Sequence, residues 1–287
     1  MGKRGAMRKV SREALALAEG VFTHAVDLAL WFIVYVGEVS LPQSVSGQVW
    51  RAQKEADRFL GEINYEVIKN AINTARKRKW VKSTKRGALP QITQEGRRRL
   101  ASVIPVYDEK RIWDSRLHLI TYDIPEERKT DREKLRNYLR RIGCGKLQDS
   151  VWMTPYNPID TLRSFIDERM LGGTIIISDL GQDASIGEED IQTLLVRVYD
   201  LEKLNMRYEE WLSQNDKGRI DHYALIQFLA VLRDDPQLPF VLLPPWWKGR
   251  EAYERVKALL RKSSRPVAIE RVTFLLSSCP EEVKECG

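Results

Sequence analysis

Residues 64–100, NYEVIKNAINTARKRKWVKSTKRGALPQITQEGRRRL, carry three successive patterns that few small folds accommodate together. The segment opens with the apolar periodicity of an amphipathic helix, continues as two strand-like stretches around Arg86-Gly87, and ends as a second helix. Eleven of its residues are Lys or Arg, and two, Glu66 and Glu95, are acidic. So much positive charge on an ordered unit indicates a polyanion as the partner.

Two more helices are predicted upstream, at residues 25–39 and 47–60. The first contains the run LALWFIVYV, which is too short to cross a bilayer and is preceded by Asp27, so we predict a buried helix and no membrane partner. Three helices, a hairpin and a further helix follow one another in the order of a winged helix-turn-helix. We therefore expect this fold within residues 1–105.

The third helix of this unit is the candidate recognition helix. Projection at about 100° per residue gathers Val67, Ile68, Ala71, Ile72 and Ala75 on an apolar side. Asparagine can pair with adenine, and basic side chains can reach guanine or phosphate. The predicted DNA-binding residues lie on the polar side and flanks of this helix and at the hairpin tip: Lys69, Asn70, Asn73, Thr74, Arg76, Lys77, Lys85 and Arg86. The alternative is a solvated basic helix without a sequence-specific partner.

The charge of the chain is divided unevenly. The net charge is +7, yet residues 1–112 contain 21 Lys or Arg against 11 Asp or Glu, and the remainder is slightly acidic. This asymmetry favours a polyanion-binding module followed by a nearly neutral body. Cys144, Cys279 and Cys286 lack metal-ligand spacing, which is typical of reduced thiols in a cytoplasmic protein. The basic arm at residues 3–12 either enters a groove of DNA or is a solubilising tail.

The middle of the chain, residues 112–198, follows a linker at residues 105–111 and alternates strands with helices. RLHLITYDIP, GKLQDSVWMTP and GTIIIS each have the composition of a strand. Thr130 and Glu133 have the spacing of a capping box before a helix whose buried stripe is predicted at Leu135, Tyr138, Leu139 and Ile142. A second helix is indicated by Ile159, Leu162, Phe165 and Ile166. This order predicts a split βαβ, ferredoxin-like domain.

The stretch LITYDIPEERKTDREKLRNYLRRIGCGKLQDSVWMTP resembles the Cas2-like central domain of the PaaX family, repressors of phenylacetate-degradation operons. VYDLEKLNMRYEEWL and DDPQLPFVLLPPWWKG are similar to the C-terminal pattern of the same family. The resemblance covers residues 25–255. It implies an α+β protein with a winged helix at 1–105, a ferredoxin-like domain at 112–198 and a mostly helical domain at 199–287. It also implies a homodimer on operator DNA that responds to an acyl-CoA effector, an aryl-CoA thioester such as phenylacetyl-CoA.

Two features depart from the family pattern. The recognition helix of the family usually carries an Arg-Thr pair about where this chain has Lys69-Asn70, and the segment between the first and third helices is longer here. We therefore expect a different operator sequence and the same binding mode.

Asp123 is the candidate metal ligand of the chain. The central domain also resembles, more distantly, a small CRISPR-associated subunit, in which an Asp at the end of the first strand is linked with metal-dependent nuclease activity. One carboxylate makes a poor magnesium site unless another chain or the substrate adds ligands. The favoured alternative is that Asp123 caps the turn into IPEERKT. Of the histidines, His118 is expected on a strand surface. Trp246-Trp247 lines a pocket or forms a structural clamp.

The sequence thus favours a cytoplasmic transcriptional repressor that is not an enzyme and needs no cofactor. The alternative is a metal-dependent nuclease or a CRISPR-type nucleic-acid scaffold that uses the central domain. No role is predicted for the acidic loop at residues 179–190.

Overall fold

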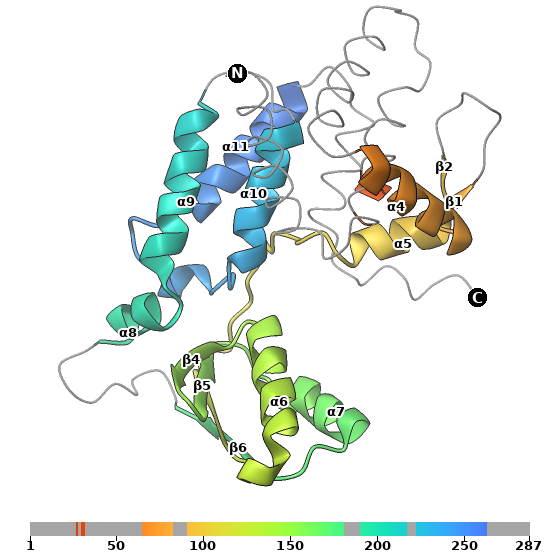
Figure 1. Ribbon diagram of the computed structural model, residues 1–287. Coiled ribbons are helices and arrows are strands. Elements are labelled where there is room, and N and C mark those ends of the chain that lie inside the picture. Colours follow the sequence, from red (N-terminus) through yellow and green to blue (C-terminus); the bar gives the residue numbers. More distant parts are fainter. Residues whose placement is uncertain are drawn as a thin grey trace, which may run out of the picture. The chain divides into compact units, whose positions relative to one another are not determined.

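The computed structural model describes residues 65–82, 91–180, 190–216 and 222–262, together with Asp27, Leu30 and Trp31 (Figure 1). This part of the chain contains eight α-helices and two antiparallel sheets. The chain divides into two compact units. One comprises residues 1–107, 210–233 and 250–287, and the other comprises residues 108–209 and 234–249.

The first unit contains the helix–hairpin–helix part of the predicted winged helix. Its elements are α4 (Tyr65–Lys77), β1 (Val81–Lys82), β2 (Gln91–Ile92) and α5 (Gln94–Ala101). β1 pairs antiparallel with β2, with Val81 opposite Ile92. In the predicted first helix, Asp27, Leu30 and Trp31 are helical and buried. The predicted helix at 47–60, the hairpin tip with Lys85 and Arg86, and the basic arm lie outside the described residues.

Backbone hydrogen bonds fix the end of α4 against the hairpin. Lys79 has a left-handed backbone with φ of 60°, and the N–H of Trp80 donates to the carbonyl of Ala75 over 2.9 Å. This pattern closes a helix with a Schellman motif. The chain therefore turns sharply from α4 into β1.

Thr93 and Gly96 hold the start of α5 close to the same turn. The hydroxyl of Thr93 donates to the carbonyl of Lys79 over 2.8 Å and accepts from the N–H of Gly96 over 3.1 Å, which makes Thr93 the N-cap of α5. A Cβ at Gly96 would lie 2.3 Å from the carbonyl oxygen of Trp80. Glycine is therefore needed where helix and hairpin approach each other.

The central sheet has the predicted ferredoxin-like topology. Its elements are β3 (His118–Asp123), α6 (Lys129–Arg141), β4 (Gly145–Gln148), β5 (Val151–Thr154), α7 (Ile159–Arg169) and β6 (Thr174–Asp179). The strands lie in the order β4-β5-β3-β6, and neighbouring strands are antiparallel. β4 follows β3 through a helix and is separated from it by β5, which is the split βαβ arrangement.

Two local predictions in this domain are wrong. GKLQDSVWMTP forms two strands, because a tight turn at Asp149-Ser150 divides it. The turn is held from outside, since the carbonyl of Asp149 accepts from the hydroxyl of Tyr122 over 2.8 Å. The capping box is absent: α6 begins at Lys129 directly after the 3-10 turn η1 (Glu126–Arg128), so Thr130 lies inside the helix.

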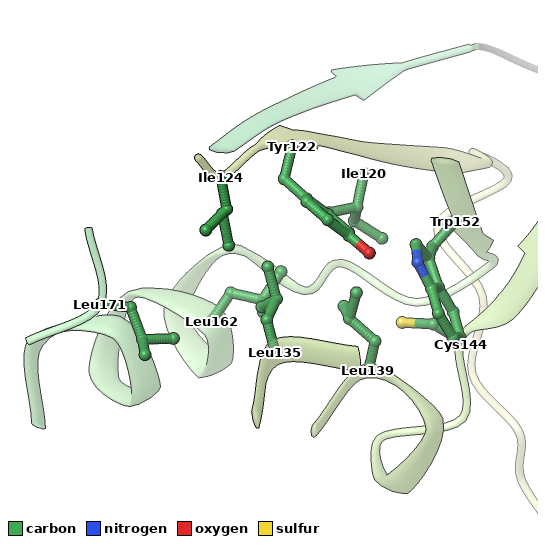
Figure 2. Packing of buried hydrophobic residues seen from close by; sticks show 9 residues of the cluster. All are labelled: Ile120, Tyr122, Ile124, Leu135, Leu139, Cys144, Trp152, Leu162 and Leu171. Atoms are coloured by element: carbon green, nitrogen blue, oxygen red, sulfur yellow. The ribbon is translucent and has the colours of Figure 1, made fainter. Parts of the chain in front are cut away.

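One face of the sheet packs against α6 and α7 (Figure 2). Ile120 and Trp152 from the strands meet Leu135 and Leu139 from α6 and Leu162 from α7, and all five are at most 1% exposed. Tyr138 and Ile142 are partly buried beside them. The predicted stripe of α6 is thus confirmed. Apolar side chains recurring every three or four residues on the helices cover those that alternate along the strands.

The other face carries a second core. Leu117 and Met153 pack with Leu195 of α8 (Ile191–Val198) and Leu242 of the 3-10 turn η2 (Phe240–Leu242). A Cβ at Gly145 would lie 2.4 Å from Cγ1 of Val198, so β4 and α8 are in close contact. The residues of this core come from segments that are far apart in the sequence, so their packing holds the second unit together.

The last third is mostly helical in its described part, as predicted. It contains α9 (Leu201–Gln214), α10 (His222–Asp234) and α11 (Gly249–Lys262). Trp211 of α9 donates its indole N–H to the carbonyl of Ala224 in α10 over 2.7 Å, and its ring packs on Phe228 with the ring centroids 5.5 Å apart. Among the described helices, none has the length and apolar character needed to cross a membrane.

Candidate nucleic-acid interface

α4 has two chemically distinct sides. Ala71 and Ala75 are 4% and 0% exposed, and their small side chains let the helix lie close to the rest of its unit. Asn70 and Asn73 are exposed on the other side, together with Arg76 and Lys77 in the last turn. Since cations are favoured at a helix C-terminus, the two basic residues also suit the helix itself. The structure thus leaves the predicted amides free to meet solvent or a ligand.

Thr74 differs from the predicted polar side. Its side chain is half-buried, and its hydroxyl donates to the carbonyl of Asn70 over 2.9 Å. A hydroxyl bonded to its own helix has less capacity left for a base edge. Arg76 Nη1 lies 3.4 Å from Asn73 Oδ1, a long contact that links the flank of α4 to its exposed face.

A basic hollow of about 930 Å³ lies where α4 ends, the hairpin begins and α5 starts. Five of its lining residues are basic, and we use the name basic hollow for the space between them: Arg76, Arg78, Lys79, Lys82 and Arg97. Glu95 supplies the one carboxylate of the lining, beside Val81, Ile92, Thr93 and Gln94. Hydrogen bonds from backbone N–H and from Thr93 hold the pKa of Glu95 below its usual value, so it is ionised at neutral pH. The hollow is strongly cationic even so.

The three consecutive arginines of α5 have different surroundings. Arg97 lines the basic hollow, whereas Arg98 is exposed and outside it. Arg99 donates to both carboxylate oxygens of Asp27 over 2.8 and 2.7 Å, and its guanidinium lies 5.7 Å from the ring centre of Trp80. Since the Asp27 side chain is 1% exposed, this pair fastens α5 to the N-terminal helix. Sequence reasoning gave no role to Lys79, Lys82 or Arg97, which the hairpin brings together.

The predicted site residues are therefore only partly assembled by the described structure. Asn70, Asn73, Arg76 and Lys77 share the exposed part of α4. Lys69 belongs to α4, but its side chain lies outside the described part, as do Lys85 and Arg86. Their roles remain predictions.

Asp123 lies at the exposed end of β3, opposite Thr174 of β6. It does not cap the following turn, because the residue at the N-terminus of η1 is Pro125. Within the described ranges, no group of three or more His, Cys, Asp or Glu side chains is placed to hold a metal ion. A metal at Asp123 would therefore need ligands beyond those that the described residues supply.

The family model of the PaaX protein central Cas2-like domain matches residues 110–185. Residues 110–185 of this chain are therefore similar to the PaaX central Cas2-like domain. The match spans β3 to β6 with both helices and confirms the resemblance seen in the sequence. No curated protein matches the chain.

Among solved structures, the uncharacterized protein Rv0674 from Mycobacterium tuberculosis is similar, with 17% identity and a TM-score of 0.52. The likeness covers 83% of this chain and 96% of that chain. At this identity it shows a common fold.

Beside the PaaX central domain, the DDPQLP segment encloses a buried arginine. Arg111 and Asp235 have side chains with no exposed area, and Arg111 Nη2 lies 3.6 Å from Asp235 Oδ2. The hydroxyl of Tyr208 donates to the same carboxylate over 2.9 Å, and Arg111 donates to the carbonyl of Leu238 over 3.0 Å. Burial raises the pKa of Asp235, which Arg111 and the hydrogen bonds oppose. The segment expected to be a simple linker is thus anchored at Arg111.

Two other sequence interpretations, on His118 and on the Trp246-Trp247 pair, are tested by the structure. His118 is 5% exposed, with Nε2 3.3 Å from Asp114 Oδ2, so its prediction as a surface residue is wrong. Trp247 is 9% exposed, and its ring meets Tyr208 edge-on with the ring centroids 5.5 Å apart. Trp247 therefore packs as a structural clamp, whereas Trp246 is 40% exposed.

Proposed function

We propose that this chain is a DNA-binding transcriptional regulator, a repressor acting in the cytoplasm, and that α4 reads its operator. The observation that carries the proposal is the exposed amide face of α4 beside a basic hollow, built on a helix–hairpin–helix unit. The PaaX central domain in the same chain supports it, because that family comprises repressors.

The proposed division of roles follows from side-chain chemistry. Asn70 and Asn73 are short amides whose donor and acceptor can pair with one adenine edge. Arg76 and Lys77 stand at the end of the same face, where positive charge suits phosphate. The predicted hairpin tip, Lys85 and Arg86, adds a second contact to backbone or minor groove.

A homodimer and an acyl-CoA effector complete the proposal. Two copies on a palindromic operator would double the contact area and fix the spacing of half-sites. An aryl-CoA thioester such as phenylacetyl-CoA would lower DNA affinity by binding one conformation more tightly than the other. The homodimer and the effector are both proposed from the resemblance of the two later domains to the PaaX family.

Selection from a random double-stranded DNA library tests the function. Full-length protein should enrich a discrete sequence, which should then bind more tightly than random DNA in fluorescence anisotropy. Affinity for both DNAs should fall steeply with salt, because phosphate contacts release counterions. A protein that enriches no sequence and has no affinity for DNA would contradict the proposal.

Asp123 motivates the second candidate, a metal-dependent nuclease. Incubation of the protein with labelled DNA or RNA and Mg²⁺ or Mn²⁺ separates the two readings. We expect no cleavage, and we expect Asp123→Asn to leave operator affinity unchanged, since Asp123 belongs to the central sheet. Cleavage by the wild type that Asp123→Asn abolishes would establish the nuclease instead.

The effector is tested by calorimetry across a panel of CoA thioesters, followed by operator release. An aryl-CoA thioester should bind and lower operator affinity, and free CoA should do so more weakly. If no thioester gives heat or releases DNA, the chain regulates without this class of ligand.

A further inference from the structure

We propose that the basic hollow holds the sugar-phosphate backbone of the DNA strand that borders the groove occupied by α4. This inference rests on the proposed function and assigns a DNA contact to Lys79, Lys82 and Arg97. Of these, two come from the hairpin region and one from α5.

The charge of the lining selects an anion. Five basic residues and one carboxylate line the hollow, and the five basic residues are exposed to solvent. Like charges this close repel one another, so an anionic ligand between them lowers the free energy of the lining as well as its own. Phosphate matches this need, since Arg and Lys bind it through charge-assisted hydrogen bonds.

The composition of the lining favours a phosphodiester chain over a small organic effector. Pockets for small molecules are lined mainly by apolar and aromatic side chains. Here Val81 and Ile92 are the apolar members of the lining, and none of its residues is aromatic. A volume of about 930 Å³ also exceeds what a single phosphate fills, whereas a stretch of backbone can follow the hollow.

The hollow is preorganised by contacts within the protein. Thr93 ties α5 to the end of α4 through the Lys79 carbonyl, and the guanidinium of Arg78 lies 5.0 Å from the ring centre of Trp80. An arginine stacked on an indole loses less conformational freedom when it binds a ligand. The cations are thus presented on a fixed scaffold before DNA arrives.

The position of the hollow fits the proposed use of α4. Arg76 lines the hollow and also reaches Asn73 on the exposed face, so the hollow begins where that face ends. A helix in the major groove is flanked by the phosphates of both strands. One of these strands would pass through the hollow while Asn70 and Asn73 reach bases.

Arg97→Ala and Arg98→Ala form a matched test, because the two residues are adjacent, exposed and identical in charge. Only Arg97 lines the hollow. With full-length protein, Arg97→Ala should weaken binding to selected operator and to random DNA alike, by about tenfold, as expected for a charged hydrogen bond. The slope of log affinity against log salt should lessen by about 0.9. Arg98→Ala should change affinity and slope much less.

Glu95→Gln should have the opposite effect on DNA affinity, since it removes the negative charge from the hollow. Both DNAs should then bind more tightly. Suppose that the wild type binds DNA. If Arg97→Ala then has the same effect as Arg98→Ala, or if Glu95→Gln weakens binding, the hollow does not hold the DNA backbone. The proposed function would still stand in that case. If the wild type binds no DNA, both fail together.

Discussion

Under the proposed function, Asn73 is one of two amides, with Asn70, that we expect to read base edges. Its amide is exposed in the middle of the polar side of α4, where it can donate to and accept from one base. Asn73→Ala should therefore cost about 1–3 kcal/mol on the operator. Binding to random DNA should hardly change, because phosphates dominate it. Anisotropy titrations on both DNAs make the measurement, and Arg97→Ala, expected to weaken both alike, is the control.

Burial lowers the reactivity of the Cys144 thiol. The thiol is 6% exposed, and burial raises its pKa to about 12, partly offset by a hydrogen bond with Thr154. A higher pKa means less thiolate, which is the species that reacts. Alkylation of native Cys144 by iodoacetamide at pH 8 should be about a thousandfold slower than that of an ordinary thiol.

Mass spectrometry of the peptide that contains Cys144 follows this reaction without interference from other cysteines. Unfolding in urea should restore an ordinary rate. Rapid alkylation of the native protein would mean that the α6–β4 junction opens far more readily than its packing suggests.

At the scale of the helices, α5 carries an ion pair with a buried carboxylate. Arg99 binds both oxygens of the buried Asp27 carboxylate, so Arg99→Ala leaves that carboxylate without this partner. Removing one partner of a buried pair costs about 3–5 kcal/mol, and we expect the low end because the Arg99 side chain is 33% exposed. Arg98→Ala is the control and should alter the free energy of unfolding by less than about 0.5 kcal/mol. Equal effects of the two changes in chemical denaturation would contradict the assignment.

In the DDPQLP segment, the neighbouring residues Asp234 and Asp235 should contribute very differently to stability. Asp235→Asn should destabilise the protein by about 3–5 kcal/mol, because it leaves the charge of buried Arg111 uncompensated. Asp234 pairs with Arg207 over 2.7 Å, with the two side chains 45% and 38% exposed, so Asp234→Asn should cost at most about 1 kcal/mol. Urea denaturation measures the free energy of unfolding of both variants. Equal losses would mean that the buried Arg111–Asp235 pair does not stabilise the segment more than the exposed pair does.

How far the sequence predicts these elements depends on the range of the interactions involved. The stripe Leu135–Leu139 of α6 and the alternation along β3 are local patterns, so periodicity located both. The Asp149-Ser150 turn was missed because contacts from Tyr122 and Arg136, distant in sequence, help to hold it. The three arginines of α5 look alike in sequence, and only the positions of Asp27 and the hairpin distinguish them.

At the scale of the whole molecule, charge is divided unevenly along the chain. The first 112 residues carry the positive excess, and the remainder carries a small negative one. We therefore expect DNA affinity to reside in the predicted winged helix. The sequence alone predicts this charge asymmetry. The gathering of basic residues in the hollow could not be predicted, because it depends on the pairing of β1 with β2.

Salt-dependent DNA binding by two triply substituted full-length proteins tests this central claim. One replaces Arg76, Lys82 and Arg97 of the basic hollow by alanine, and the other replaces Lys129, Arg163 and Arg169, which are exposed basic residues of the central domain. Both lose three positive charges. We expect the first protein to show a slope of log affinity against log salt that is smaller by about 2.7, and the second to keep a slope near the wild-type value. A flattened slope in the second protein with an unchanged slope in the first would place DNA binding in the central domain and contradict the account.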